Sequence, residues 1–218
     1  MSTRWGPGYH GKLPSRGDFV AFGLPREFVE PWDGWLATAL TEAQAALGPP
    51  WEGLFAAAPP WRFALAAGVC GPAAVAGVLV ASRDRVGRLY PFMIAAAAPR
   101  GVEVAAVPAG CRGWFERAER LAVAAAHAAI NLHTLPARAA AIGRPDATPS
   151  PAHRAVVESH LGPLPGTPSL WWTGGGGRVE PSLLACPGLP DGLRFAAMLD
   201  NGWERRGWET AEVSAPVP

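Results

Sequence analysis

The chain has 218 residues, a length typical of one domain, and 49% of them are hydrophobic, so a sizeable core can form. Its formal net charge of +1 gives no field strong enough to imply a nucleic-acid partner or an anionic membrane. Composition therefore allows a folded core and argues against nucleic-acid binding and membrane insertion.

The first half of the chain predicts helices followed by strands. A short helical turn is expected at residues 26–30, after Pro25, and Pro31 is expected to interrupt it. Apolar residues at helical spacing predict a longer helix at 32–47, with a short helix at 51–57. Strands are expected at 61–67, 75–82 and 92–98, with a charged turn at 83–89. The uncharged run 64–81 is interrupted by Gly68, Gly71, Pro72 and Gly77, which favours two buried strands over a membrane span.

The second half predicts a long helix at 111–133 and a Pro- and Ala-rich surface insertion at 134–166 with a short helix at 151–161. A strand at 169–173, a glycine hairpin tip at 174–177, a returning segment at 178–185 and a helix at 193–199 follow. Residues 1–209 are expected to form a single domain, and residues 210–218 are expected to form a disordered tail after it. This order predicts an α/β fold with a mixed sheet covered by helices on both faces.

The most distinctive stretch is GYHGKLPSRGDF at residues 8–19. Glycine permits positive φ and proline fixes φ, so this punctuation predicts an ordered, partly exposed loop that holds its charged residues in set positions. The glycines and proline are Gly8, Gly11, Pro14 and Gly17, and they alternate with Lys12, Arg16, Asp18 and Phe19.

The same stretch fits most of a phosphate-binding loop, GxxxxGK, from Gly6 to Lys12. Leu13 stands where a Ser or Thr would hold Mg²⁺, and Pro14 opposes the helix that must follow. We therefore expect no nucleotide binding.

Other catalytic or metal-binding patterns are weak. The three cysteines, Cys70, Cys111 and Cys186, show no CxxC spacing, which indicates ordinary buried thiols in a reducing compartment. His153 and His160 have no carboxylate at metal-ligand spacing, and no GxSxG elbow occurs. Asp33 and Asp84 are isolated acids. Asp33 is expected to cap a helix or pair near its start, and Asp84 is expected to order a turn with Arg85 or Arg88. We expect no metal, cofactor or catalytic residue, although a scattered Ser, His and Asp triad stays open.

The ten tryptophans are numerous for this length. Most are expected in the core, and one or two exposed tryptophans would mark a partner surface.

The ordered set of motifs resembles the TagF family, accessory proteins of the bacterial type VI secretion system. The resemblance rests on GKLPSRGDFV at 11–20, FVEPWD at 28–33, WRF at 61–63, GVCG at 68–71, DRVGR at 84–88, SLWW at 169–172 and FAAML at 195–199. His10 departs from the pattern, where an aromatic is expected, and residues 99–167 match loosely.

This resemblance implies a three-layer α/β/α sandwich and a cytoplasmic protein without catalytic activity. It implies a post-translational repressor of secretion assembly that binds a cytoplasmic scaffold, notably a forkhead-associated protein, or another cytoplasmic secretion component. The alternatives are a small-molecule or nucleotide-dependent hydrolase using the Gly11 to Asp18 loop, and a structural subunit of the apparatus. Charged and aromatic residues at loop positions predict the partner-binding residues. They are Lys12, Arg16, Asp18, Phe19, Asp84, Arg85 and Arg88.

Overall fold

The computed structural model of the protein describes residues 5–128, 130–145, 150–164 and 166–208, so the predicted tail at 210–218 lies outside it. In these residues seven strands form one sheet, in the order β2-β1-β5-β4-β3-β6-β7. The strands are β1 (Gly8–Gly11), β2 (Val20–Phe22), β3 (Trp61–Leu65), β4 (Val75–Val80), β5 (Phe92–Ala97), β6 (Pro168–Thr173) and β7 (Ser182–Pro187).

All pairings between these strands are antiparallel, so the expected mixed sheet is wrong. Four of the six neighbouring pairs are consecutive in the chain, and short connections can join only antiparallel strands. The remaining pairs, β1 with β5 and β3 with β6, are antiparallel as well.

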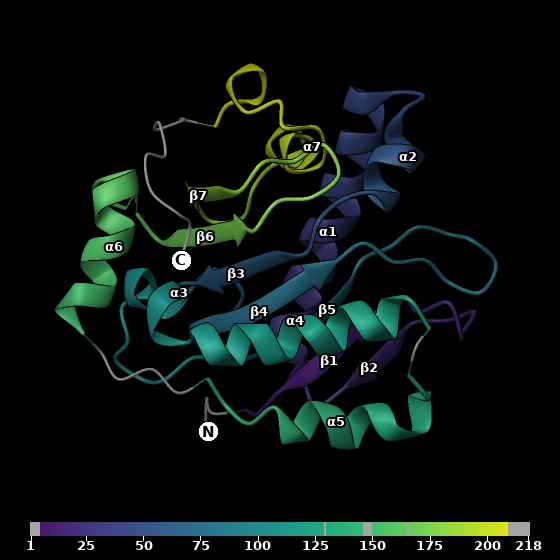
Figure 1. Ribbon diagram of the computed structural model, residues 1–218, viewed down its shortest axis with the longest axis horizontal. Coiled ribbons are helices and arrows are strands. Elements are labelled where there is room, and N and C mark those ends of the chain that lie inside the picture. The colour runs from purple at the N-terminus through teal and green to yellow at the C-terminus, as the bar shows by residue number, and fades with distance from the viewer. Residues whose placement is uncertain (1–4, 129, 146–149, 165, 209–218) are drawn as a thin grey trace.

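Helices cover the sheet from both sides, and Figure 1 shows α4 in front of the strands and α1 behind them. The described helices are α1 (Arg26–Leu47), α2 (Trp51–Ala56), α3 (Val107–Gly110), α4 (Arg112–Ala126), α5 (Leu135–Ala141), α6 (Pro151–Leu161) and α7 (Gly192–Asp200). Short 3₁₀ helices lie at Val104–Ala106, Leu132–Thr134 and Glu204–Arg206.

Two apolar clusters fill the two faces. One joins the strands to α1, α2 and α7, and the other joins them to α3, α4, α5 and α6. Successive residues of a strand point to opposite faces. On β6, Trp171 packs 6.3 Å from Trp32 of α1, whereas Trp172 packs 4.7 Å from Phe115 of α4, both measured between ring centroids. Both tryptophans are buried because both faces of the sheet are covered.

Three sequence-based expectations fail locally. The helix α1 continues through Pro31, which lies near its start on the exposed side, so only one backbone hydrogen bond is lost. The strands β1 and β2 were not expected, because their apolar signal is short and their pairing depends on β5. The helix expected at 111–133 ends at Ala126, and Ala128 has a φ of +55°, which a helix cannot accommodate.

The segment 134–166, expected as a surface insertion, contributes to the core. Leu135 and Ala139 of α5, Ile142 after it, and Val157 of α6 are buried in the cluster that α4 also joins. The packing of these small apolar residues fixes both helices against the sheet.

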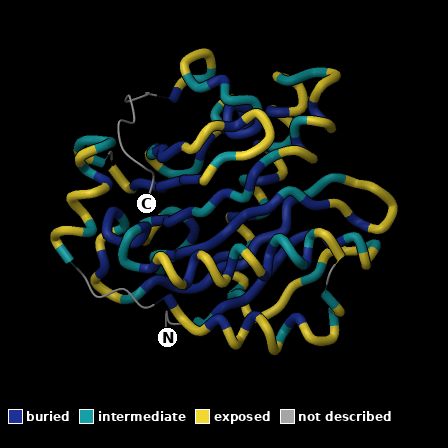
Figure 2. The backbone as a smooth tube through the Cα atoms, viewed as in Figure 1, coloured by how far each residue is buried: buried dark blue, intermediate teal, exposed yellow. Residues whose placement is uncertain are grey.

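One end of the sheet brings together the two segments in which the sequence predicted binding residues. The loop 12–19 follows β1 at Gly11, which pairs with Phe92 at the start of β5, and the connection from β4 reaches β5 beside it. Figure 2 shows that the β4–β5 connection is largely exposed at its tip. We call residues 12–19 and 82–89 the paired loops.

Candidate functional site

Asp84 lies at the centre of the paired loops, with its side chain fully buried. Its Oδ2 lies 3.1 Å from Lys12 Nζ and 2.5 Å from Arg88 Nε. Its Oδ1 accepts hydrogen bonds from the backbone N–H groups of Val86, at 3.0 Å, and Arg88, at 2.9 Å. Asp84 therefore orders its own turn with Arg88, as expected, and also anchors the first loop through Lys12.

Further bonds tie the two loops together. Ser82 Oγ donates to the carbonyl of Lys12 at 2.7 Å, and the N–H of Arg85 donates to the carbonyl of Arg16 at 2.8 Å. The guanidinium of Arg88 donates to the carbonyl of Gly17 at 2.7 Å. The loops form one braced unit, although about seventy residues separate them in sequence.

Burial alone would raise the pKa of Asp84. The N–H of Arg88, its guanidinium, the Lys12 ammonium and the N–H of Val86 outweigh that effect and hold the pKa of Asp84 well below its usual range. The carboxylate is thus ionised at neutral pH and retains its charged partners.

A second cluster, which the sequence did not predict, joins the first loop to α1. His10 Nε2 lies 2.9 Å from Oδ1 of Asp33, and Tyr90 donates its hydroxyl to the same oxygen at 2.8 Å. The ring of Phe19 stacks on His10 at 5.4 Å and meets Tyr90 edge-on at 4.8 Å, between centroids. His10 thus occupies the expected aromatic position as a flat ring that also meets a carboxylate. The departure from the family pattern at His10 was the only sequence signal for this cluster.

The contacts of this cluster shift the pKa values of its two acidic groups, Asp33 and Tyr90, in opposite directions. Burial would raise the pKa of Asp33, but His10 and Tyr90 outweigh it and lower that pKa. Burial, and then the charge and hydrogen bond of Asp33, raise the pKa of Tyr90. Tyr90 is therefore a neutral donor at physiological pH, which holds Phe19 and the loop against α1.

The predicted binding residues divide into two groups. Lys12 and Asp84 are buried and act as braces. Phe19 is 49% exposed, and Val86, which the sequence did not single out, is 68% exposed at the tip of the turn. The side chains of Arg16, Asp18, Arg85 and Arg88 also reach solvent. Among the described tryptophans none is exposed, so the exposed aromatic on this surface is a phenylalanine.

The contacts of the Lys12 side chain predict that the protein does not bind nucleotide. Its ammonium is held by Asp84 and lies 5.3 Å from the ring centroid of Phe19, so it is not free to contact a phosphate. Calorimetric titration with ATP and Mg²⁺ is expected to show no heat of binding. A micromolar site that a folded Lys12→Ala variant loses would contradict this prediction.

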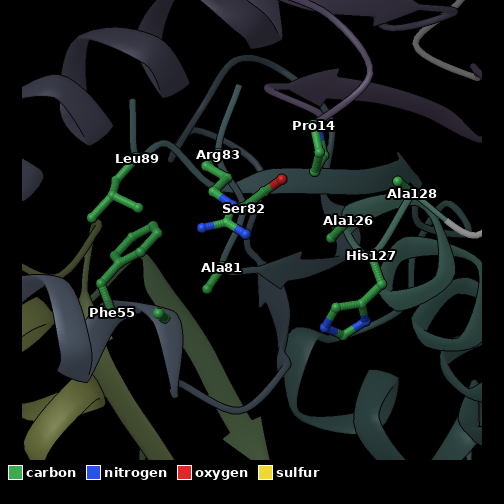
Figure 3. Close-up of a pocket in the computed structure, with 10 residues that line it drawn as sticks. Pro14, Phe55, Ala81, Ser82, Arg83, Leu89, Ala126, His127 and Ala128 are labelled. Carbon is green, nitrogen blue, oxygen red and sulfur yellow. The ribbon is translucent and has the colours of Figure 1, made fainter. Parts of the chain in front are cut away.

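A hollow of about 450 Å³ adjoins the paired loops. It is lined by Pro14, Phe55, Ala56, Ala81, Ser82, Arg83, Leu89, Ala126, His127 and Ala128. Figure 3 shows Arg83 and His127 on different walls of this space, with Phe55 and Leu89 on a third. The hollow thus combines two nitrogen-bearing side chains with apolar walls.

Metal and thiol chemistry find little support in the described part of the chain. No group of three or more His, Cys, Asp or Glu side chains in it could hold a metal ion. Burial raises the pKa of the Cys70 thiol to about 12 and also raises that of Cys186, so both are protonated at neutral pH. Among the described helices, none is long and apolar enough to cross a bilayer.

The chain is similar to known proteins in both sequence and fold. The family description "TagF N-terminal domain, Type VI secretion system-associated" matches residues 8–142. The chain is 32% identical to PA0076 from Pseudomonas aeruginosa PAO1, whose crystal structure superposes with a TM-score of 0.78 over 97% of this chain and 100% of that one. A search of curated proteins gave no match.

The fold defines an α/β protein with a seven-stranded antiparallel sheet and two loops braced at one end. The family match covers more than half of the chain, and it includes β1 to β5 and both loops. The chain belongs to the TagF family and is a type VI secretion system-associated protein.

Proposed function

We propose that this protein is a non-catalytic, cytoplasmic repressor of type VI secretion assembly. It acts by binding a secretion scaffold, a forkhead-associated protein, through the exposed side of the paired loops. The observation that carries the proposal is the buried Asp84, whose bonds to Lys12 and Arg88 brace the two family-like loops against each other. A preformed surface loses little conformational entropy on binding, and loops are where recognition residues concentrate.

The exposed groups of this surface suit a protein partner. Phe19 and Val86 offer apolar contact, and the arginines beside them offer planar, multiply donating groups. Lys12, which a nucleotide-dependent hydrolase would need, is occupied by Asp84. These features favour recognition over the hydrolase alternative.

Arg16→Ala tests the surface most cleanly, because the Arg16 side chain makes no hydrogen bond or ion pair with the described residues. We expect this variant to keep its melting temperature and to bind the scaffold roughly tenfold more weakly, the loss of about 1.4 kcal/mol. Arg88→Ala is expected to lose binding and some stability, because Arg88 also bonds Asp84 and Gly17.

Binding to purified scaffold and secretion during overproduction are the two measurements. Arg112→Ala is the matched control. Arg112 is exposed and lies at the N-terminal end of α4, whereas the C-terminal end of this helix adjoins the hollow beside the paired loops. If Arg16→Ala and Arg88→Ala fold, bind and repress as the wild type does, the paired loops are not the interface.

A gene deletion separates a repressor from a structural subunit of the apparatus. Loss of a repressor leaves secretion active or raises it, whereas loss of a structural subunit abolishes it. Abolished secretion, restored by the wild-type gene, would contradict the repressor proposal.

A further inference from the structure

The paired loops are basic compared with the rest of the chain. They contain five basic residues (Lys12, Arg16, Arg83, Arg85 and Arg88) and two acidic ones (Asp18 and Asp84), whereas the whole chain carries a formal net charge of +1. Asp84 is buried and neutralised by Lys12 and Arg88, so its charge does not offset the exposed arginines. Arg16, Arg83 and Arg85 remain exposed, and no hydrogen bond or ion pair involves their side chains within the described residues.

The hollow beside these loops has a basic lining. The guanidinium of Arg83 offers several N–H donors in one plane, and the imidazole of His127 offers a ring N–H that can donate a hydrogen bond. Within the described residues neither side chain has a hydrogen bond or ion pair, so both are available to a ligand. Phe55, Leu89 and Ala126 supply apolar walls around them.

An anionic ligand in the hollow would experience one repulsive and one attractive electrostatic effect. His127 caps the C-terminus of α4, where the last carbonyls carry a partial negative charge. The full charge of Arg83 outweighs that partial charge, and a guanidinium binds a carboxylate in a directed, bidentate way. The walls would pack against the methylene groups of a short acidic side chain. The ligand that fits is a carboxylate on a short apolar stem, as in glutamate or aspartate.

We propose that the basic end of the sheet binds an acidic segment of the partner protein, one acidic side chain of which enters the hollow between Arg83 and His127. This inference rests on the proposed function and specifies the chemistry of the partner. Exposed Phe19 and Val86 beside the arginines favour a peptide with interspersed apolar residues over a uniformly charged polymer. Asp33 of α1, which is half-exposed, contacts the His10 ring on which Phe19 stacks, and this carboxylate limits the basic surface on that side.

Fluorescence anisotropy with a labelled synthetic peptide of glutamates and leucines tests the proposal without the scaffold. A matched peptide in which glutamine replaces every glutamate is the ligand control. The wild-type protein is expected to bind the glutamate peptide and not the glutamine peptide. Raising the salt concentration should weaken binding, because exposed charges are screened over about 10 Å at 0.1 M salt.

Arg83→Gln should weaken peptide binding about tenfold or more, and His127→Ala should weaken it less. Arg112→Gln removes the same charge at the far end of α4 and should leave binding unchanged. The inference is overturned if the wild type binds neither peptide, if both peptides bind equally, if single-stranded DNA competes as well as the glutamate peptide, or if Arg83→Gln and Arg112→Gln behave alike.

The scaffold assay separates the two proposals. If Arg16→Ala loses scaffold binding but Arg83→Gln keeps it at every salt concentration, the acidic-segment inference fails while the proposed function stands. If the wild type binds the glutamate peptide but not the scaffold, the proposed partner is wrong and the acidic ligand class is supported.

Discussion

Asp84→Ala is expected to lower the melting temperature by roughly 10 °C, because it removes one partner of a buried ion pair and leaves the other without compensation. The Lys12 ammonium would lose the Asp84 carboxylate but stay in a site where only 9% of the residue is exposed. The N–H groups of Val86 and Arg88 would lose their shared acceptor as well. Thermal unfolding followed by circular dichroism measures the change.

Two further variants distinguish this cost from a general effect of losing a charge. Lys12→Met should cost much less, because Asp84 would keep Arg88 and two backbone donors. Asp18→Ala removes an exposed carboxylate and should leave the melting temperature nearly unchanged. Equal shifts for Asp84→Ala and Asp18→Ala would show that Asp84 does not brace the loops.

The contribution of Asp84 should also depend on pH. Its pKa is lower in the folded state than in the unfolded chain, where the pKa of an aspartate is about 3.9. Its stabilising effect is therefore fully present above that value and is lost as the pH falls toward the folded-state pKa. The difference in melting temperature between the wild type and Asp84→Asn should narrow below about pH 4. A gap that stays constant down to lower pH would argue against an ionised, paired Asp84.

Gly11→Ala is expected to lower the free energy of unfolding by about 3 kcal/mol or more, from backbone strain and overpacking together. Gly11 has a φ of +136°, which side-chain-bearing residues rarely adopt. A Cβ there would lie 2.2 Å from the carbonyl oxygen of Pro91 and 2.7 Å from Cα of Phe92. Both atoms belong to the backbone at the start of the neighbouring strand, so no side-chain rotation can relieve the clash.

Urea unfolding of Gly11→Ala beside Gly34→Ala tests this argument. Gly34 lies in α1, where an added Cβ would meet nothing within 4 Å, so Gly34→Ala should stabilise the protein by about 0.5–1 kcal/mol. Because Gly11 also positions Lys12, its variant should weaken scaffold binding at temperatures where it is still folded. A Gly11→Ala protein as stable as the wild type would mean that β1 does not approach β5 this closely.

The segments with strong local patterns were predicted well. The apolar stripe of residues 32–47 forms a helix, because Trp32, Leu36, Ala39 and Ala43 recur with the helical period and face the sheet. The buried runs that became β4 and β5 were also recognised from sequence, as was the charged turn between them. The short strands β1 and β2 were missed, because three or four residues carry too little periodicity to be recognised.

The candidate site shows the same division. The residue types of the two loops, their turn-forming glycines and the pairing of Asp84 with Arg88 four residues later could be predicted, because each depends on local sequence. The pairing of Lys12 with Asp84 joins residues 72 positions apart, and no local pattern encodes it. The same applies to His10 and Tyr90, which meet Asp33 from two different segments.

Motifs and hydrophobic periodicity are properties of neighbouring residues, so the family, the main helices and central strands, and the two charged loops could be predicted from the sequence. Coverage of the sheet by helices on both faces was also expected, but the antiparallel pairing of all described strands was not. Nor does the sequence show that Lys12 and Asp84 are buried braces while Arg16 and Phe19 are exposed to solvent. The physical reason is that burial and ion pairing depend on which distant segments the sheet places side by side, and here β1 beside β5 places the first loop against the β4–β5 turn.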